Sequence, residues 1–202
     1  MKKLLATFGL VLSAALMHAQ KIEIGFGAGY TRSELKNSIH EGSGFNAGVS
    51  AEYYFHKNIF GVKAKLAYSQ KGIDEMTTFR EIDEASGYSF IEVHSDFSLD
   101  YLVLPVTFEW HFGKKVQCNL GAGGYLGYLI HTQYNKKDFT IRDPEKFDTG
   151  IVVHLGAKIP VGAKTKIGLE YEGQKGFLSI YDSGSSGQNK SDSINFCIYY
   201  SL

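Results

Sequence analysis

Apolar and polar residues alternate along most of the chain. In KIEIGFGAGYTR, residues 21–32, every even position from Ile22 to Tyr30 is apolar, and glycine holds most of the positions between. A period of two is that of a β-strand, whose successive side chains point to opposite faces. The pattern predicts a strand with one apolar face and one glycine-rich polar face.

The same alternation returns seven more times, and no helical period appears after the first twenty residues. The further segments are 44–56, 59–70, 101–112, 116–132, 150–159, 164–174 and 193–202. The connections after the second, fourth and sixth strands are short, whereas long polar loops are expected at 33–43, 71–97, 135–148 and 173–192. Short turns at one end and long loops at the other predict an all-β fold: an eight-stranded antiparallel up-and-down transmembrane β-barrel.

The distribution of charge indicates which face of this barrel meets lipid. Charged residues of the predicted strands fall only on the glycine-rich face, where a narrow lumen leaves little room for side chains. They are Glu23, Glu52, Lys63, Lys65, Glu109, Lys158, Lys166, Glu170 and Glu172. Aromatic residues of the apolar face gather near the strand ends, as at the two membrane interfaces. A soluble lipocalin-like barrel, with the faces reversed, is the alternative.

The N-terminus has the layout of a secretory signal peptide. Lys2 and Lys3 precede an apolar run from Leu4 to about Met17, which is too short to span a bilayer as a helix. We expect residues 1–19 to be a signal peptide and residues 20–202 to be one barrel domain in the bacterial outer membrane. The mature chain is nearly neutral, without the concentrated basic face of a nucleic-acid-binding protein, so no nucleic-acid partner is expected.

The two cysteines are expected to be free thiols. The strand assignment places Cys118 and Cys197 on opposite faces of strands that are not neighbours, and a disulfide needs two side chains that face each other.

One strand resembles a known family. YLVLPVTFEWHF, residues 101–112, is similar to the signature strand of the PorT-like outer-membrane β-barrel family, with Tyr-Leu, a Pro three residues after the Leu, and an aromatic end. NLGAGGYLGYLI and GIVVHLGAKI look like its fifth and sixth strands. The resemblance implies the barrel fold, and some members of the family are linked to protein export and gliding. The chain departs from the usual terminal Phe of such barrels, ending in Leu202.

The inward charges form the first candidate site. A tight turn at Lys57-Asn58 would place Glu52 opposite Lys63, and Ser50 opposite Lys65, on the lumen side. The predicted lumen charge network consists of Glu52, Lys63, Lys65, Glu109, Lys158, Lys166 and Glu170. Two interpretations are open: a gated path for small solutes or ions, or a fixed network of paired charges that plugs the lumen. His131 and His154 also point inward.

A second candidate site would make the protein a lipid-modifying enzyme. In HSDFS, His94, Asp96 and Ser98 share one strand face, but period-two neighbours lie about 7 Å apart, too far for direct hydrogen bonds. An ordinary polar strand face is the alternative. The sequence predicts no catalytic residues, no metal site and no cofactor.

The loop 71–97 is the third candidate. From Asp74 to Asp96 its acidic residues are Asp74, Glu75, Glu81, Asp83 and Glu84, followed by Glu92 and Asp96, against the single arginine Arg80. Such a loop suits docking of envelope proteins, or bridging by divalent cations to lipopolysaccharide, because hard cations prefer oxygen ligands; a solvated loop is the alternative. The sequence therefore favours a non-enzymatic outer-membrane protein whose partners are membrane lipid, lipopolysaccharide and envelope proteins.

Overall fold

The computed structural model describes residues 22–35, 41–56, 58–84, 87–134, 137–138, 146–179 and 188–202. Side chains are described throughout these ranges except at residues 35, 73–97, 134, 137–138, 178–179 and 188. The predicted signal peptide, residues 1–19, lies outside the described part. Nine strands are formed: β1 (Ile22–Leu35), β2 (Glu41–Phe55), β3 (Phe60–Glu84), β4 (Gly87–Phe112), β5 (Gln117–Tyr134), β6 (Lys137–Asp138), β7 (Phe147–Pro160), β8 (Thr165–Ser179) and β9 (Gln188–Ser201).

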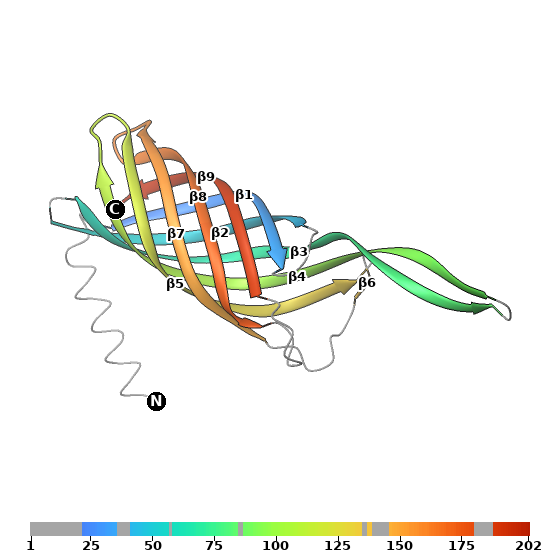
Figure 1. Ribbon diagram of the computed structural model, residues 1–202. Helices are drawn as coiled ribbons and strands as arrows, with labels where there is room; N and C mark the ends of the chain where they lie inside the picture. The colour runs from blue at the N-terminus through green and yellow to red at the C-terminus, as the bar shows by residue number, and fades with distance from the viewer. Residues whose placement is uncertain are drawn as a thin grey trace.

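The strands close into one barrel (Figure 1). Each pairs antiparallel with its neighbour along the chain, β1 pairs with β9, and the two-residue β6 only adds to the end of β5. Eight long strands therefore make the wall, which confirms the predicted fold. Closure matters because backbone polar groups cannot be left unpaired in lipid. Among the described residues, no helix is long and apolar enough to span a membrane.

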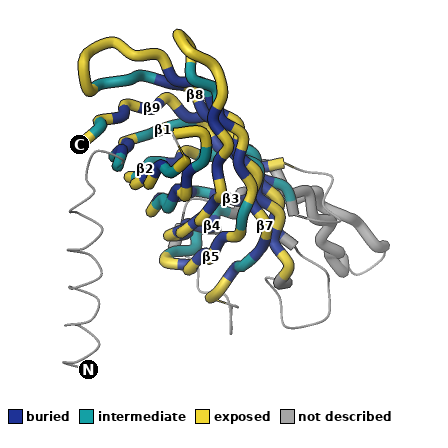
Figure 2. The backbone as a smooth tube through the Cα atoms, turned by 90° about the vertical axis from the view of Figure 1, so that its left-hand side faces the viewer, coloured by how far each residue is buried: buried dark blue, intermediate teal, exposed yellow. Residues whose placement is uncertain are grey.

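The outer surface of the barrel is apolar, and the polar strand face lies inside. Exposed large side chains such as Leu169 (59% exposed) and Phe196 (52%) cover the outer face, whereas Glu109 and Lys158 are fully buried. Figure 2 shows this alternation of buried and exposed residues along each strand. The lipid-facing assignment of the sequence is confirmed, because a soluble barrel would carry the opposite arrangement.

Aromatic rings gather on the outer face at the short-turn end. Phe60 lies against Phe55 and Phe108, with ring centroids 6.2 Å and 5.6 Å apart, and Trp110 lies 5.3 Å from Phe112. Aromatic belts of this kind sit at membrane interfaces in outer-membrane barrels. The belt marks the level at which the short turns leave the membrane.

The predicted long loops are shorter than expected, because the strands continue into them. The prediction was most wrong at residues 71–97: β3 runs to Glu84, β4 begins at Gly87, and the two remain paired to their ends after a register shift between Ile73 and Met76. This hairpin reaches well beyond the other strands (Figure 1). Beyond the membrane a strand pair needs no apolar face, so the period-two signal that marks the barrel strands is lost there.

Other boundaries moved for the same reason. β1 extends to Leu35, β8 to Ser179, and β9 begins at Gln188, all inside segments predicted as loops. The expected free thiols are confirmed: Cys118 and Cys197 are unpaired. The register is also as predicted, with Glu52 opposite Lys63 and Ser50 opposite Lys65.

The face assignment predicts a depth-dependent cost of charge on one strand. Val153 and Ile159 are both about half exposed on the outer face of β7, the first at mid-strand and the second near the short-turn end. Val153→Arg should lower the free energy of unfolding by about 2–4 kcal/mol and Ile159→Arg by about 0–1 kcal/mol. Urea unfolding in lipid vesicles measures both values. Equal, negligible costs would mean that the outer face meets water.

Candidate functional site

The lumen near the short turns is built around Lys158 on β7. Its ammonium donates to Glu23 Oε1 at 2.6 Å and to Glu52 Oε2 at 2.9 Å, from β1 and β2. Tyr54 donates to Glu23 Oε1 at 2.9 Å, and Lys166 Nζ lies 2.5 Å from Glu23 Oε2. Lys158 is fully buried, so its charge is compensated by protein groups instead of water.

His111 completes this end of the lumen. Its Nε2 lies 2.5 Å from Glu52 Oε1, and its ring lies against that of Tyr54, with centroids 4.8 Å apart. The carboxylate of Glu52 is thus held from two sides, by an imidazole on β4 and an ammonium on β7.

The middle of the lumen is joined by His154 on β7. Its Nδ1 lies 3.0 Å from Glu109 Oε2 and its Nε2 lies 3.2 Å from Glu170 Oε2. Glu170 also forms an ion pair with Lys63 and accepts a hydrogen bond from Tyr199. Tyr199 connects this layer to the layer near the short turns, because Lys158 Nζ lies 4.2 Å from the centre of the Tyr199 ring.

Glu109 is held by neutral donors as well. Asn119 Nδ2 donates to its Oε2 at 2.8 Å, and Thr107 Oγ1 donates to its Oε1 at 2.5 Å. A Cβ added at Gly121 would lie 2.3 Å from this carboxylate, and one added at Gly156 would lie 2.5 Å from Asn119 Oδ1. The glycines of the inner face therefore provide the space that the larger polar side chains occupy.

The layer toward the long loops was largely missed from the sequence. Lys71 is buried there: its Nζ donates to Gln174 Oε1 at 3.0 Å and lies 3.7 Å from Asp148 Oδ2. The same ammonium lies 5.3 Å and 5.2 Å from the ring centres of Tyr101 and Tyr125. Lys71 and Asp148 were assigned to loops because they lie outside the apolar alternation of their strands. Lys71 follows the predicted strand 59–70, and Asp148 precedes the predicted strand 150–159.

All seven residues of the predicted lumen charge network are placed inside the barrel. The structure pairs Lys65 with Glu172 at 2.9 Å. Glu172 and Glu23 were predicted to face the lumen but were not included in the predicted network. Lys63 sits opposite Glu52 in the strand register, yet its ion pair is with Glu170 across the lumen. Register alone therefore did not identify the partner, because in a narrow barrel long side chains reach the far wall.

The other two candidate sites fall mainly on residues whose side chains are not described. His94 and Asp96 lie on the outer part of β4, and Ser98 is half-buried at its base. The acidic residues Asp74, Glu75, Glu81, Asp83 and Glu84 lie on the extension of β3. His131 is half-buried on β5. No group of His, Cys, Asp and Glu in the described part is arranged to hold a metal ion.

The arrangement fills the lumen with paired charges instead of leaving an open path. Ion pairs and hydrogen bonds join β1, β2, β3, β4, β7, β8 and β9 across the interior. An eight-stranded barrel has an interior only just wide enough for its own side chains. The chemistry that this network supplies is mutual neutralisation.

The network predicts strong coupling between Lys158 and its carboxylates. Lys158→Met should lower the free energy of unfolding by about 3–5 kcal/mol, because Glu23 and Glu52 lose a buried counter-charge. Urea unfolding of the refolded barrel measures this loss, and Lys175→Met, an exposed lysine on β8, is the matched control.

A second substitution separates charge from packing. Adding Glu52→Gln to Lys158→Met removes part of the uncompensated charge and should recover part of the lost stability. A double variant whose loss equals the sum of the two single losses would contradict the coupling.

Comparison with known proteins agrees with this geometry. The family model described as outer membrane protein beta-barrel domain matches residues 18–182. The crystal structure of neisserial surface protein A superposes with a TM-score of 0.59 and 14% identity, over 90% of this chain and 97% of its own. OprG from Pseudomonas aeruginosa gives 0.50 and 12%, over 90% and 96%. At such identities these structures show the fold alone. No curated protein matches the sequence.

Proposed function

The chain belongs to the family of outer-membrane protein β-barrel domains and lies in the bacterial outer membrane, and we propose that it acts there as a non-enzymatic envelope protein through its outward segments. Support comes from how its surfaces are occupied. The outer wall meets lipid, and the lumen is filled by its own ion pairs. The ends of the strands are then the surfaces left for partners.

The observation that carries the proposal is the β3–β4 hairpin. Its strands stay paired as far as Glu84 and Gly87, beyond the last pair of β4 with β5, between Phe97 and Tyr134. A paired ribbon presents its residues to solvent at a fixed distance from the membrane, which an irregular loop does not. Maintaining so long an ordered projection is consistent with contact to something outside the membrane.

The composition of this hairpin suggests its partners. Between Asp74 and Asp96 the sequence carries seven carboxylates and one arginine. Divalent cations bound by these carboxylates would bridge to the phosphates of lipopolysaccharide, and basic surfaces of envelope proteins would dock directly. Within the family, the strand Tyr101–Phe112 supports a narrower placement among PorT-like barrels.

A narrow channel for small solutes or ions is the second candidate, and a lipid-modifying enzyme is the third. The channel would need the ion pairs of Lys63 and Lys158 to open, which would leave buried charges without their counter-charges. The enzyme would need His94, Asp96 and Ser98 to converge from a single strand. The hairpin requires neither rearrangement, so we favour the interaction role.

Deletion of residues 74–92 tests the role of the hairpin. The deletion joins Ile73 to Val93 and leaves four residues to close the pair between Ile73 and Phe97, a normal hairpin connection. A strain that lacks the protein, complemented with this variant, should keep the envelope defect of the deletion strain, scored as sensitivity to bile salts and vancomycin. Full complementation would contradict the proposal.

Two further variants make the result specific. A barrel in which Asp74, Glu75, Glu81, Asp83 and Glu84 are changed to Asn or Gln keeps the ribbon and removes five of its seven carboxylates. It should fail in the same assay if partners are recognised by charge. Deletion of residues 181–187, at another connection of the same end, is the control. Faster electrophoretic migration without boiling shows for each variant that the barrel is assembled.

A further inference from the structure

The barrel has a recess at its short-turn end that the extracellular role does not use. Its volume is about 620 Å³, within the range of small-molecule sites. The polar residues that line it are Asn58, His111, Lys114, Lys115, Gln117 and Lys166. No lining residue carries a carboxylate, so the recess is a cationic mouth that faces the periplasm.

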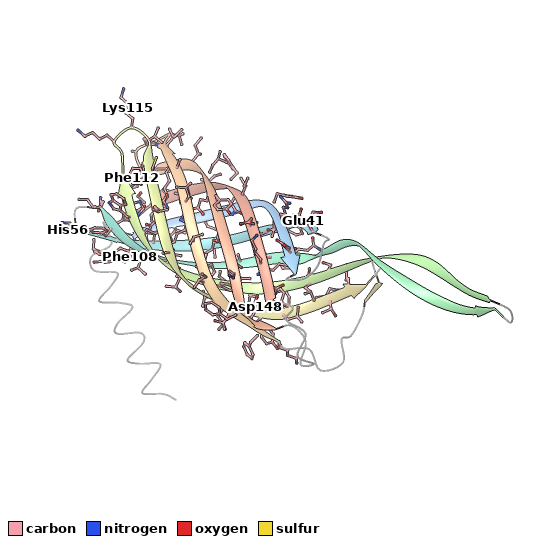
Figure 3. All side chains as sticks on the ribbon, viewed as in Figure 1. Glu41, His56, Phe108, Phe112, Lys115 and Asp148 are labelled. Atoms are coloured by element: carbon pink, nitrogen blue, oxygen red, sulfur yellow. The ribbon has the colours of Figure 1, made fainter. Side chains whose placement is uncertain are left out.

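The turn that carries two of these lysines has a fixed shape. Gly113 has a φ of 92°, a backbone conformation that other residues rarely adopt, and a Cβ there would lie 2.1 Å from the carbonyl oxygen of Val116. This glycine directly follows the last residue of β4 and sets the direction of the turn that carries Lys114 and Lys115. Figure 3 shows Lys115 at the tip of this turn, with Phe112 at its base.

The mouth carries more positive charges than the carboxylates of the lumen neutralise. Lys166 and His111 are already paired from behind, with Glu23 and Glu52. Lys114 and Lys115 are exposed and form no ion pair with any described residue. The three short turns, residues 56–59, 113–116 and 161–164, contain lysines and a histidine and no Asp or Glu. This end of the barrel thus has opposite charge to the acidic hairpin.

A buried polar atom in the wall of the mouth also lacks a partner. His111 Nδ1 is inaccessible to solvent and makes no hydrogen bond among the described residues, while Nε2 of the same ring faces Glu52. Because this atom is inaccessible to solvent, it offers no contact to a ligand, and the recess is defined by its shape and its lysines.

We propose that this recess binds a phosphate group, with Lys114, Lys115 and Lys166 as its cationic contacts. The aromatic rings of Phe108, Trp110 and Phe112 lie on the outer face at the same end, so the mouth lies at the depth of the phosphate groups of membrane lipids. The phosphate can therefore come from an anionic phospholipid of the periplasmic leaflet or from a soluble phosphate compound. The inference is independent of the role proposed for the hairpin.

The test uses the refolded full-length mature barrel in a non-ionic detergent. Isothermal titration with inorganic phosphate measures a soluble source, and native mass spectrometry with phosphatidylglycerol against phosphatidylcholine measures a lipid source. We expect saturable binding in at least one arm and preference for the anionic lipid in the second. The double variant Lys114→Gln/Lys115→Gln should weaken binding on the order of tenfold or more, because it removes two charge-assisted contacts.

The matched control is Lys175→Gln/Lys190→Gln, which removes the same charge from exposed positions toward the long-loop end. Binding of phosphate but not of lipid, or of lipid alone, would support the site and identify its source. Binding that the control weakens as much as the turn variant would overturn the proposal, as would absence of binding in both arms. The heat-dependent shift in migration confirms that each variant is folded.

Discussion

Because lipid covers the outside of the barrel, the charged side chains of the central strand segments must point into the lumen. Inside it, a charge has to find an opposite charge, because little water is there to solvate it. Lys158 between Glu23 and Glu52, and Glu170 between Lys63 and His154, show how this is met. The partners come from strands far apart in sequence, so the network also fixes which strands close the barrel.

This constraint determines where the molecule can act. In the described part of the barrel, paired side chains occupy the lumen, and the outer wall is apolar and faces lipid. What remains is at the two ends, and they differ in charge: an acidic ribbon formed by β3 and β4 at one end, and turns rich in lysine at the other.

The alternation of the sequence predicted the strand number, the closure, the lipid-facing side and the inward charges, because lipid and a narrow lumen impose opposite demands on successive residues. It did not predict where the strands end. Outside the membrane that demand disappears, so the extension of β3 to Glu84 read as a loop, and Lys71 and Asp148 at the boundary were misplaced. The alternation also did not predict which charges pair across the lumen. Lys63 on β3 pairs with Glu170 on β8, and these two strands are not neighbours in the wall.

We infer that the lumen is closed by its own charges. Conductance of the purified protein in a planar lipid bilayer tests this claim most directly. We expect a silent membrane, with no discrete steps at moderate voltage. Reproducible steps whose ion preference changes with Lys63→Glu would contradict this expectation. Such steps would mean that ions pass the ion pair between Lys63 and Glu170.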